Sequence, residues 1–170
     1  MKIVRAGLFV FGGLFLVMTL ISMLIPSTIM TAKAVTVQCD STKLFSIVSN
    51  LQNWKKWHPV FVADSTKITI TNAGNIATWS STGKENKIVI TKSAYPEVNF
   101  LLQREGENDM ENTIYVNRVE EAGNMQVQWK SVVKLKWYPW EKFAGIFIEK
   151  LSGAGYEAAL ASLKKYVEGN

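Results

Sequence analysis

The chain has 170 residues, 48% of them hydrophobic and 19% charged, and its formal net charge is +5. A single cysteine, Cys39, and a single histidine, His58, exclude an intramolecular disulfide, a thiolate metal cage and a histidine-rich metal site. No element carries Lys or Arg in a run interleaved with aromatic residues, so the sequence predicts no nucleic-acid partner, no metal and no cofactor.

The N-terminal segment contains a long apolar run. From Ala6 to Ile25 the sequence has twenty residues without a charge. As a helix they would extend about 30 Å, which is the thickness of a hydrocarbon core. This pattern predicts one transmembrane anchor over residues 1–26, followed by a single domain over residues 27–170 that lies close to the membrane surface.

A secretory signal peptide is the alternative interpretation of this segment. Lys2 and Arg5 form a basic start, and Ala32-Lys33-Ala34 matches the small-x-small cleavage pattern. The apolar run exceeds the roughly 7–15 residues of a signal peptide, which favours an uncleaved anchor. The two N-terminal basic residues favour a cell-membrane protein with its N-terminus in the cytoplasm and its domain on the extracytoplasmic side.

The domain is expected to begin with a strand and a short helix. Residues 30–37 are rich in β-branched side chains, and Asp40 then offers an N-cap for a helix ending near Asn50. A Trp-rich segment follows, in which Pro59 is expected to stop any helix.

The middle of the chain changes to the period of two that is typical of strands. Apolar and polar residues alternate near residues 67–71 and over 76–81, 87–93, 98–104, 113–120 and 125–137, with short polar turns between them. From Glu141 the period returns to 3.6. The order predicts an α+β domain in which one curved antiparallel sheet wraps its apolar face around a long C-terminal helix.

The element order carries a resemblance to a known superfamily. A W-x-x-W-x-P element lies at Trp54, Trp57 and Pro59 after the first helix of the domain, and residues 157–164 are similar to the superfamily's closing helix. Over most of residues 29–167 the chain resembles the START-like helix-grip (SRPBCC) superfamily, in its polyketide cyclase/dehydrase and lipid-transport branch. Members of this superfamily have diverse activities, so the fold alone does not assign one.

The resemblance implies an apolar cavity between the sheet and the C-terminal helix. We expect its ligand contacts among residues on the predicted apolar faces and in the loop near its opening, although each of these side chains fits a filled core as well. The candidates are Trp57, Trp79, Phe100, Val127, Trp129, Val133, Phe143, Phe147 and Leu160.

These expectations favour a membrane-anchored domain that binds a hydrophobic small molecule or lipid. The alternatives are a cyclase- or dehydrase-like enzyme acting on such a ligand, and a ligand-free module that contacts another envelope protein.

No catalytic residue is assigned, because nothing in the spacing brings Cys39 and His58 together. Arg104, Tyr115 and Arg118 are candidate polar residues of a cavity, although each fits the solvated face equally well. The acidic turn 105–111 lacks the ordered oxygen ligands of a calcium loop and is interpreted as a solvated hairpin tip.

Overall fold

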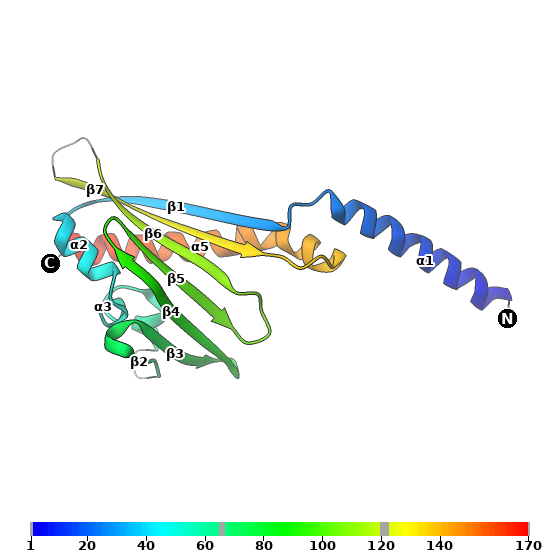
Figure 1. Ribbon diagram of the computed structural model, residues 1–170, viewed down its shortest axis with the longest axis horizontal. Coiled ribbons are helices and arrows are strands. Elements are labelled where there is room, and N and C mark those ends of the chain that lie inside the picture. Colours follow the sequence, from blue (N-terminus) through cyan, green and yellow to red (C-terminus); the bar gives the residue numbers. More distant parts are fainter. Residues whose placement is uncertain (1, 65–66, 120–122, 170) are drawn as a thin grey trace.

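The computed structural model of the protein describes residues 2–64, 67–119 and 123–169 (Figure 1). The helices are α1 (Lys2–Met23), α2 (Ser41–Val48), α3 (Leu51–Trp54), α4 (Pro59–Ala63), the 3-10 turn η1 (Asn72–Gly74) and α5 (Pro139–Glu168). The strands are β1 (Thr28–Gln38), β2 (Thr69–Thr71), β3 (Ile76–Ser81), β4 (Lys84–Ala94), β5 (Glu97–Arg104), β6 (Met110–Arg118) and β7 (Asn124–Lys134).

The strands form one curved antiparallel sheet. In the described residues its order is β1-β7-β6-β5-β4-β3-β2, so β2 to β7 form a meander and β1 pairs along the full length of β7. The alternation of β7 places Val127, Trp129 and Ser131 on the buried face. The predicted antiparallel meander with one dry face is therefore confirmed.

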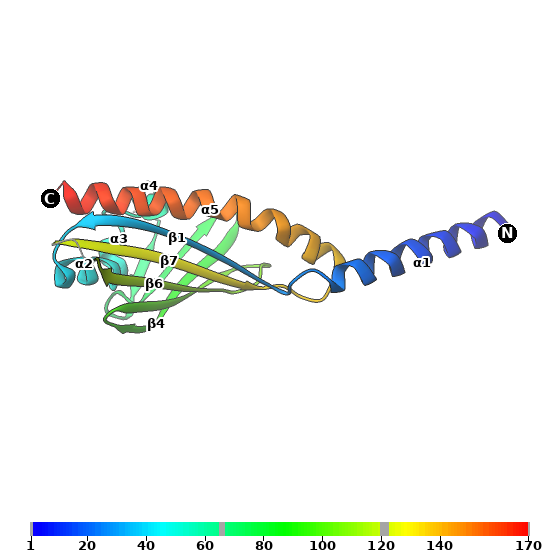
Figure 2. The ribbon, with the colours of Figure 1, turned by 90° about the horizontal axis from the view of Figure 1, so that it is seen from above.

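Helix α5 lies along the concave face of this sheet (Figure 2). Ala159, Leu160, Leu163 and Val167 are its buried apolar residues toward the C-terminal end. The helix begins at Pro139, two residues before the predicted start, because proline at the first helical position loses no hydrogen bond. The predicted α+β helix-grip architecture is confirmed.

The segment between α2 and β2 differs from the prediction. Pro59 does not stop a helix but begins α4, since the first turn of a helix has no need of its N–H. The predicted helix with its N-cap at Asp40 and its end near Asn50 is confirmed as α2, which ends at Val48. A second short helix that was not predicted, α3, follows it, and the Asn50 side chain caps α3 by accepting a hydrogen bond from Gln52 N at 2.8 Å.

Trp54 attaches these short helices to the core of the domain. Its side chain is fully buried, and its indole Nε1 donates a hydrogen bond to the Val48 carbonyl at 2.9 Å. Its ring meets Phe100 of β5 at 5.2 Å and Trp129 of β7 at 5.8 Å between ring centroids. The Trp-rich segment therefore packs into the concave side of the sheet.

Helix α1 projects away from the sheet, and most of its described apolar side chains are exposed (Figures 1 and 2). Its C-terminal end is held near the start of α5, where Lys142 Nζ donates a hydrogen bond to the Ile25 carbonyl at 2.9 Å. Within the part of the chain that the structure describes, no helix combines the length and apolarity needed to cross a membrane.

Candidate ligand-binding cavity

A cavity of about 360 Å³ lies between the concave face of the sheet and α5. It is bounded by the segment from the end of α3 to α4, by β3 to β7 and by the middle of α5. The lining residues are Trp54, His58, Val60, Phe61, Trp79, Ile88, Phe100, Leu102, Arg104, Met110, Asn112, Trp129, Ser152, Gly155, Tyr156 and Ala159. This lining is mainly apolar and aromatic with a few polar groups, as is typical of small-molecule sites.

Aromatic rings form much of the wall of the cavity. Phe100 meets Trp129 at 5.7 Å, and Phe61 meets Trp54 at 5.6 Å and Trp79 at 5.8 Å between ring centroids. Edge-to-face and tilted contacts of this kind stabilise aromatic clusters beyond their buried area. The wall therefore consists of large side chains that hold one another in place.

His58 lies within this aromatic wall. Its ring stacks on Trp54 at 5.2 Å with an interplanar angle of 11°, and it also contacts Trp57, Phe61 and Trp129. Burial lowers the pKa of His58 from 6.5 to about 4, so its imidazole is neutral at physiological pH. Its Nδ1 atom is buried and has no hydrogen-bond partner among the described residues.

Two further polar residues of the lining contact Trp129. The Asn112 carboxamide accepts a hydrogen bond from Trp129 Nε1 at 3.1 Å and donates one to the Met110 carbonyl at 2.9 Å. The Tyr156 ring meets Trp129 at 5.1 Å, and burial raises the pKa of the Tyr156 hydroxyl against smaller opposing effects of Ser131 and Arg104. Tyr156 therefore contributes an uncharged hydroxyl group at physiological pH.

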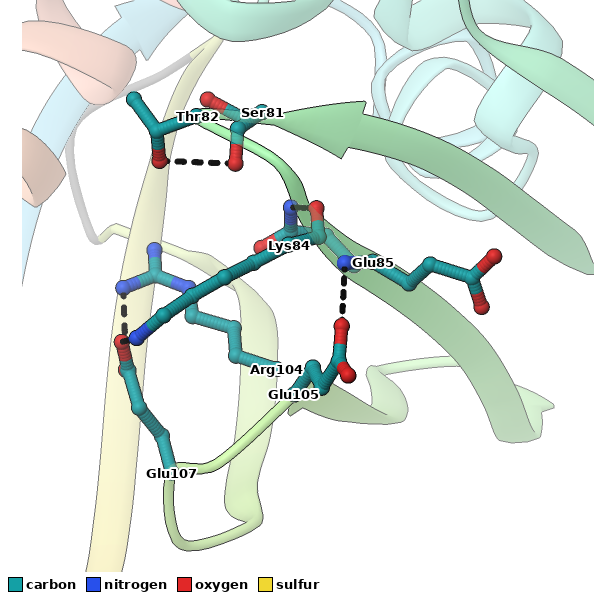
Figure 3. A network of polar contacts seen from close by, with 8 residues as sticks. Ser81, Thr82, Lys84, Glu85, Arg104, Glu105 and Glu107 are labelled. Atoms are coloured by element: carbon teal, nitrogen blue, oxygen red, sulfur yellow. Dashed lines mark hydrogen bonds and ion pairs between the residues drawn. The ribbon is translucent and has the colours of Figure 1, made fainter.

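Arg104 lies at the opening of the cavity, because it lines the cavity and is also exposed to solvent. Figure 3 shows its guanidinium beside Glu107, which also pairs with Lys84. The Arg104 Nη1–Glu107 Oε2 distance is 3.6 Å and the Lys84 Nζ–Glu107 Oε1 distance is 3.8 Å. These pairs are solvated and contribute little stability, but they keep a positive group near the cavity entrance.

The acidic turn shows no metal-binding arrangement. Glu105 accepts a hydrogen bond from the backbone of Glu85 at 3.2 Å, and Asp109 accepts one from Gln103 at 3.1 Å. Among the residues described, no group of three or more His, Cys, Asp or Glu side chains is placed to hold a metal ion.

Two wider hollows, of about 680 and 760 Å³, lie outside the cavity. Most of their lining residues are exposed, and many are charged, which suits a small apolar ligand less well than the inner cavity does. Cys39 lines the first of these hollows, whereas His58 lines the inner cavity, so the structure does not bring the two together.

The residues predicted from the sequence fall into three groups. Trp79, Phe100 and Trp129 line the cavity. A second group, Trp57, Val127, Val133 and Leu160, is buried but does not line it. Phe143 is half-buried, and Phe147 is 65% exposed rather than turned toward the sheet.

Among the candidate polar residues, only Arg104 is part of the lining. Tyr115 lies on β6 between the buried Ile114 and Val116 and therefore belongs to the outer face, and Arg118 is exposed. Sequence analysis did not assign Asn112 or Tyr156 to the cavity. The alternation of β6 was the available signal for Asn112, since it places this residue on the same face as Ile114.

The comparisons with known proteins agree with this architecture. Residues 28–168 match the family model described as polyketide cyclase / dehydrase and lipid transport. A search of curated proteins finds no match.

Three similar solved structures illustrate the likeness. A START superfamily protein from Mycobacterium smegmatis is 19% identical with a TM-score of 0.61, over 82% of this chain and 97% of that chain. The protein XoxI from Bacillus cereus is 12% identical with a TM-score of 0.61, over 81% of this chain and 94% of that chain. The di-domain ARO/CYC BexL from the BE-7585A biosynthetic pathway is 17% identical with a TM-score of 0.62, over 82% of this chain and 46% of that chain.

At these identities the solved structures establish the fold, and the family model adds a match in sequence. Because that match covers most of the chain, from the first strand of the sheet to the end of α5, the protein belongs to the polyketide cyclase / dehydrase and lipid transport family.

Proposed function

We propose that this protein binds a hydrophobic small molecule or a lipid chain in the cavity between the sheet and α5. The observation that carries this proposal is the apolar and aromatic lining of a cavity of about 360 Å³. Its volume is at the lower end of the roughly 300–1,000 Å³ typical of ligand pockets, which favours a compact molecule or a single acyl chain.

The ligand contacts predicted from the sequence remain part of this proposal. Trp79, Phe100 and Trp129 are the best supported of them, because they line the cavity. Trp57, Val127 and Leu160 are buried near these residues and would act by holding the wall in place rather than by contact.

We also propose that residues 1–26 attach the domain, residues 27–170, to the cell membrane, with the domain on the extracytoplasmic side. Two observations support attachment. Apolar side chains of α1 are exposed around the helix, and a helix that is apolar on all sides normally requires an apolar environment. Trp137 and Trp140, close in sequence to the α5 residue that bonds to the end of α1, are also exposed.

An enzymatic role is the second candidate function. The lining is not wholly apolar, since His58 and Tyr156 both line the cavity and both have a pKa shifted by burial. Shifted titratable groups in a cavity occur often at active sites. A cyclase- or dehydrase-like reaction on the bound ligand would use such groups.

Native mass spectrometry of the detergent-extracted full-length protein tests the binding function. We expect an apolar adduct at one molecule per chain. Gly155 provides a matched pair of variants, because it lines the cavity and a Cβ built there meets no atom within 4 Å. Gly155→Phe should fill the cavity and abolish the adduct, whereas Gly155→Ala should retain it. A folded wild-type protein without any adduct would contradict the proposal.

The recovered adduct then distinguishes the two candidate functions. When the extracted molecule is returned to ligand-free protein, simple binding predicts that it is recovered unchanged. Chemical conversion by the wild type, lost in His58→Phe or Tyr156→Phe, would instead support the enzyme.

A further inference from the structure

We infer that His58 selects uncharged ligands that carry a hydroxyl group, by forming a hydrogen bond with that group inside the cavity. This inference rests on the proposed function and specifies the class of ligand. It concerns the single histidine of the chain, and it follows from one buried nitrogen atom that has no hydrogen-bond partner among the described residues.

The Nδ1 atom of His58 is buried and lacks a partner among the described residues. Buried polar groups in folded proteins are almost always hydrogen-bonded, so an unpaired one indicates a missing partner. Trp57 Nε1 is also buried without a partner among these residues, but Trp57 does not line the cavity. A molecule in the cavity is therefore the natural partner for His58.

Asn112, another polar residue of the lining, already has hydrogen-bond partners. The Asn112 carboxamide uses its oxygen for Trp129 Nε1 and its nitrogen for the Met110 carbonyl. The imidazole of His58, in contrast, is held by stacking on Trp54 and by edge contacts with Phe61. Its orientation is therefore fixed before a ligand arrives, which reduces the entropic cost of the hydrogen bond.

The chemistry of a neutral imidazole explains the choice of a hydroxyl group. One ring nitrogen donates a hydrogen bond and the other accepts one, and a hydroxyl is both donor and acceptor, so it fits either tautomer. A carboxylate fits less well, because burial holds His58 in its neutral form and the nearby wall is aromatic. The positive group of the lining, Arg104, lies at the opening and pairs with Glu107.

The presence of a single histidine allows a direct test by NMR on the full-length protein. With ¹⁵N-labelled histidine, every imidazole signal belongs to His58. We would titrate the protein with three probes of similar size: 2-naphthol, 2-methylnaphthalene and 2-naphthoate. Occupancy of the cavity is read separately from the indole signals of Trp79 and Trp129, which both line it.

The expected result is that 2-naphthol shifts the Nδ1 resonance of His58 and the indole signals together, to saturation. The methyl analogue should shift the indole signals alone. The affinity for 2-naphthol should be about tenfold higher, as expected for one additional hydrogen bond, and this preference should be lost in His58→Phe. If that variant does not fold, the Nδ1 shift of the wild type still decides the question.

Four outcomes would overturn the inference. Indole shifts with an unchanged Nδ1 signal for both neutral probes would remove His58 as the recognition group and leave the proposed binding function intact. A hydroxyl preference lost in Tyr156→Phe and kept in His58→Phe would assign the recognition to Tyr156. Tighter binding of 2-naphthoate, lost in Arg104→Gln, would show selection for an anion at the opening. If no probe shifts any signal, the proposed function fails together with the inference.

Discussion

His58 is a histidine whose environment favours only its neutral form. Its ring lies among Trp54, Trp57, Phe61 and Trp129, and none of these side chains carries a charge that would stabilise an imidazolium. Desolvation is accordingly the cause of its lowered pKa. Because the folded protein disfavours protonation of His58 and the unfolded chain allows it, the stability of the protein depends on pH.

We therefore predict that the protein loses stability as the pH falls from 7 to 5. The folded pKa of His58, about 4, is below the unfolded value of 6.5, so in this window the unfolded state binds the extra proton. The expected loss in the free energy of unfolding is about 2 kcal/mol. Denaturant unfolding of wild type and His58→Gln at both pH values measures it. An equal loss in the variant would show that other groups are responsible.

Gly74 offers a second prediction about a single residue. It has a φ of +93°, and a Cβ built there would lie 2.7 Å from Asn50 Cγ. Gly74→Ala should therefore strain the backbone and also displace the side chain that caps α3, at a total cost of about 2–3 kcal/mol. Gly83 is the matched control, because it has a φ of +78° with no atom within 4 Å of the built Cβ.

The two variants separate backbone strain from the close approach. Gly83→Ala should cost only about 1–2 kcal/mol, which is the cost of the left-handed conformation itself. Thermal or urea unfolding of both variants gives the difference. If both variants lose the same stability, the contact between Gly74 and Asn50 contributes nothing.

At the scale of secondary-structure elements, the short helices α2 to α4 depend on one side chain. Trp54 bonds to the end of α2 and packs on β5 and β7, so it joins these helices to the sheet. Trp79 also lines the cavity, but it is half-buried and belongs to β3. Substitution of Trp54 should therefore mainly affect the stability of the domain, and substitution of Trp79 should mainly affect ligand binding.

We predict that Trp54→Phe destabilises the domain by about 2–3 kcal/mol, because it leaves the Val48 carbonyl unpaired and a cavity beside Phe100. Trp79→Phe should cost less than about 1 kcal/mol in stability and should weaken the binding of 2-methylnaphthalene. Urea unfolding and the NMR titration measure the two effects. A larger stability loss for Trp79→Phe would contradict this division.

The strands were predictable from the sequence because the sheet has one dry face. The alternation over residues 76–81 gave the exact bounds of β3, and the alternation of β7 identified its buried face. The short helices α3 and α4 were missed because four or five residues are too few to show a period of 3.6.

The cavity was predictable only in part. Its lining comes from the segment from the end of α3 to α4, from strands β3 to β7 and from α5, so no local pattern encodes it. Resemblance supplied its general place, and the apolar faces supplied Trp79, Phe100 and Trp129. Phe147 was predicted as a cavity residue from the apolar stripe of the C-terminal helix, but its side chain is exposed. An apolar stripe on a helix does not reveal whether another element covers it.

At the scale of the whole molecule, a cluster of aromatic residues lies at the start of α5. Trp137 and Trp140 are 69% and 63% exposed, and Tyr138 stacks on Trp140 at 5.1 Å with an interplanar angle of 3°. They lie in sequence between the end of β7 and Lys142, which holds the C-terminal end of α1. Trp and Tyr side chains are favoured at membrane–water interfaces, because their rings are apolar with one polar group.

If residues 1–26 attach the protein to a bilayer, this aromatic cluster should lie at the level of the lipid headgroups. We predict that lipids brominated near the headgroup quench the tryptophan fluorescence of full-length protein in liposomes. Trp137→Phe with Trp140→Phe should remove most of this quenching. Trp79→Phe is the matched control, because Trp79 lines the cavity and should leave the quenching unchanged.

The liposome experiment also tests attachment itself, because flotation of the same samples reports whether the protein stays with the lipid. Co-flotation with quenching that depends on Trp137 and Trp140 would place the domain against the bilayer, with the start of α5 at the membrane surface. Co-flotation without quenching would leave α1 attached and the aromatic cluster in water. Protein that remains at the bottom of the gradient would contradict membrane attachment, and the exposed apolar side chains of α1 would then require a protein partner.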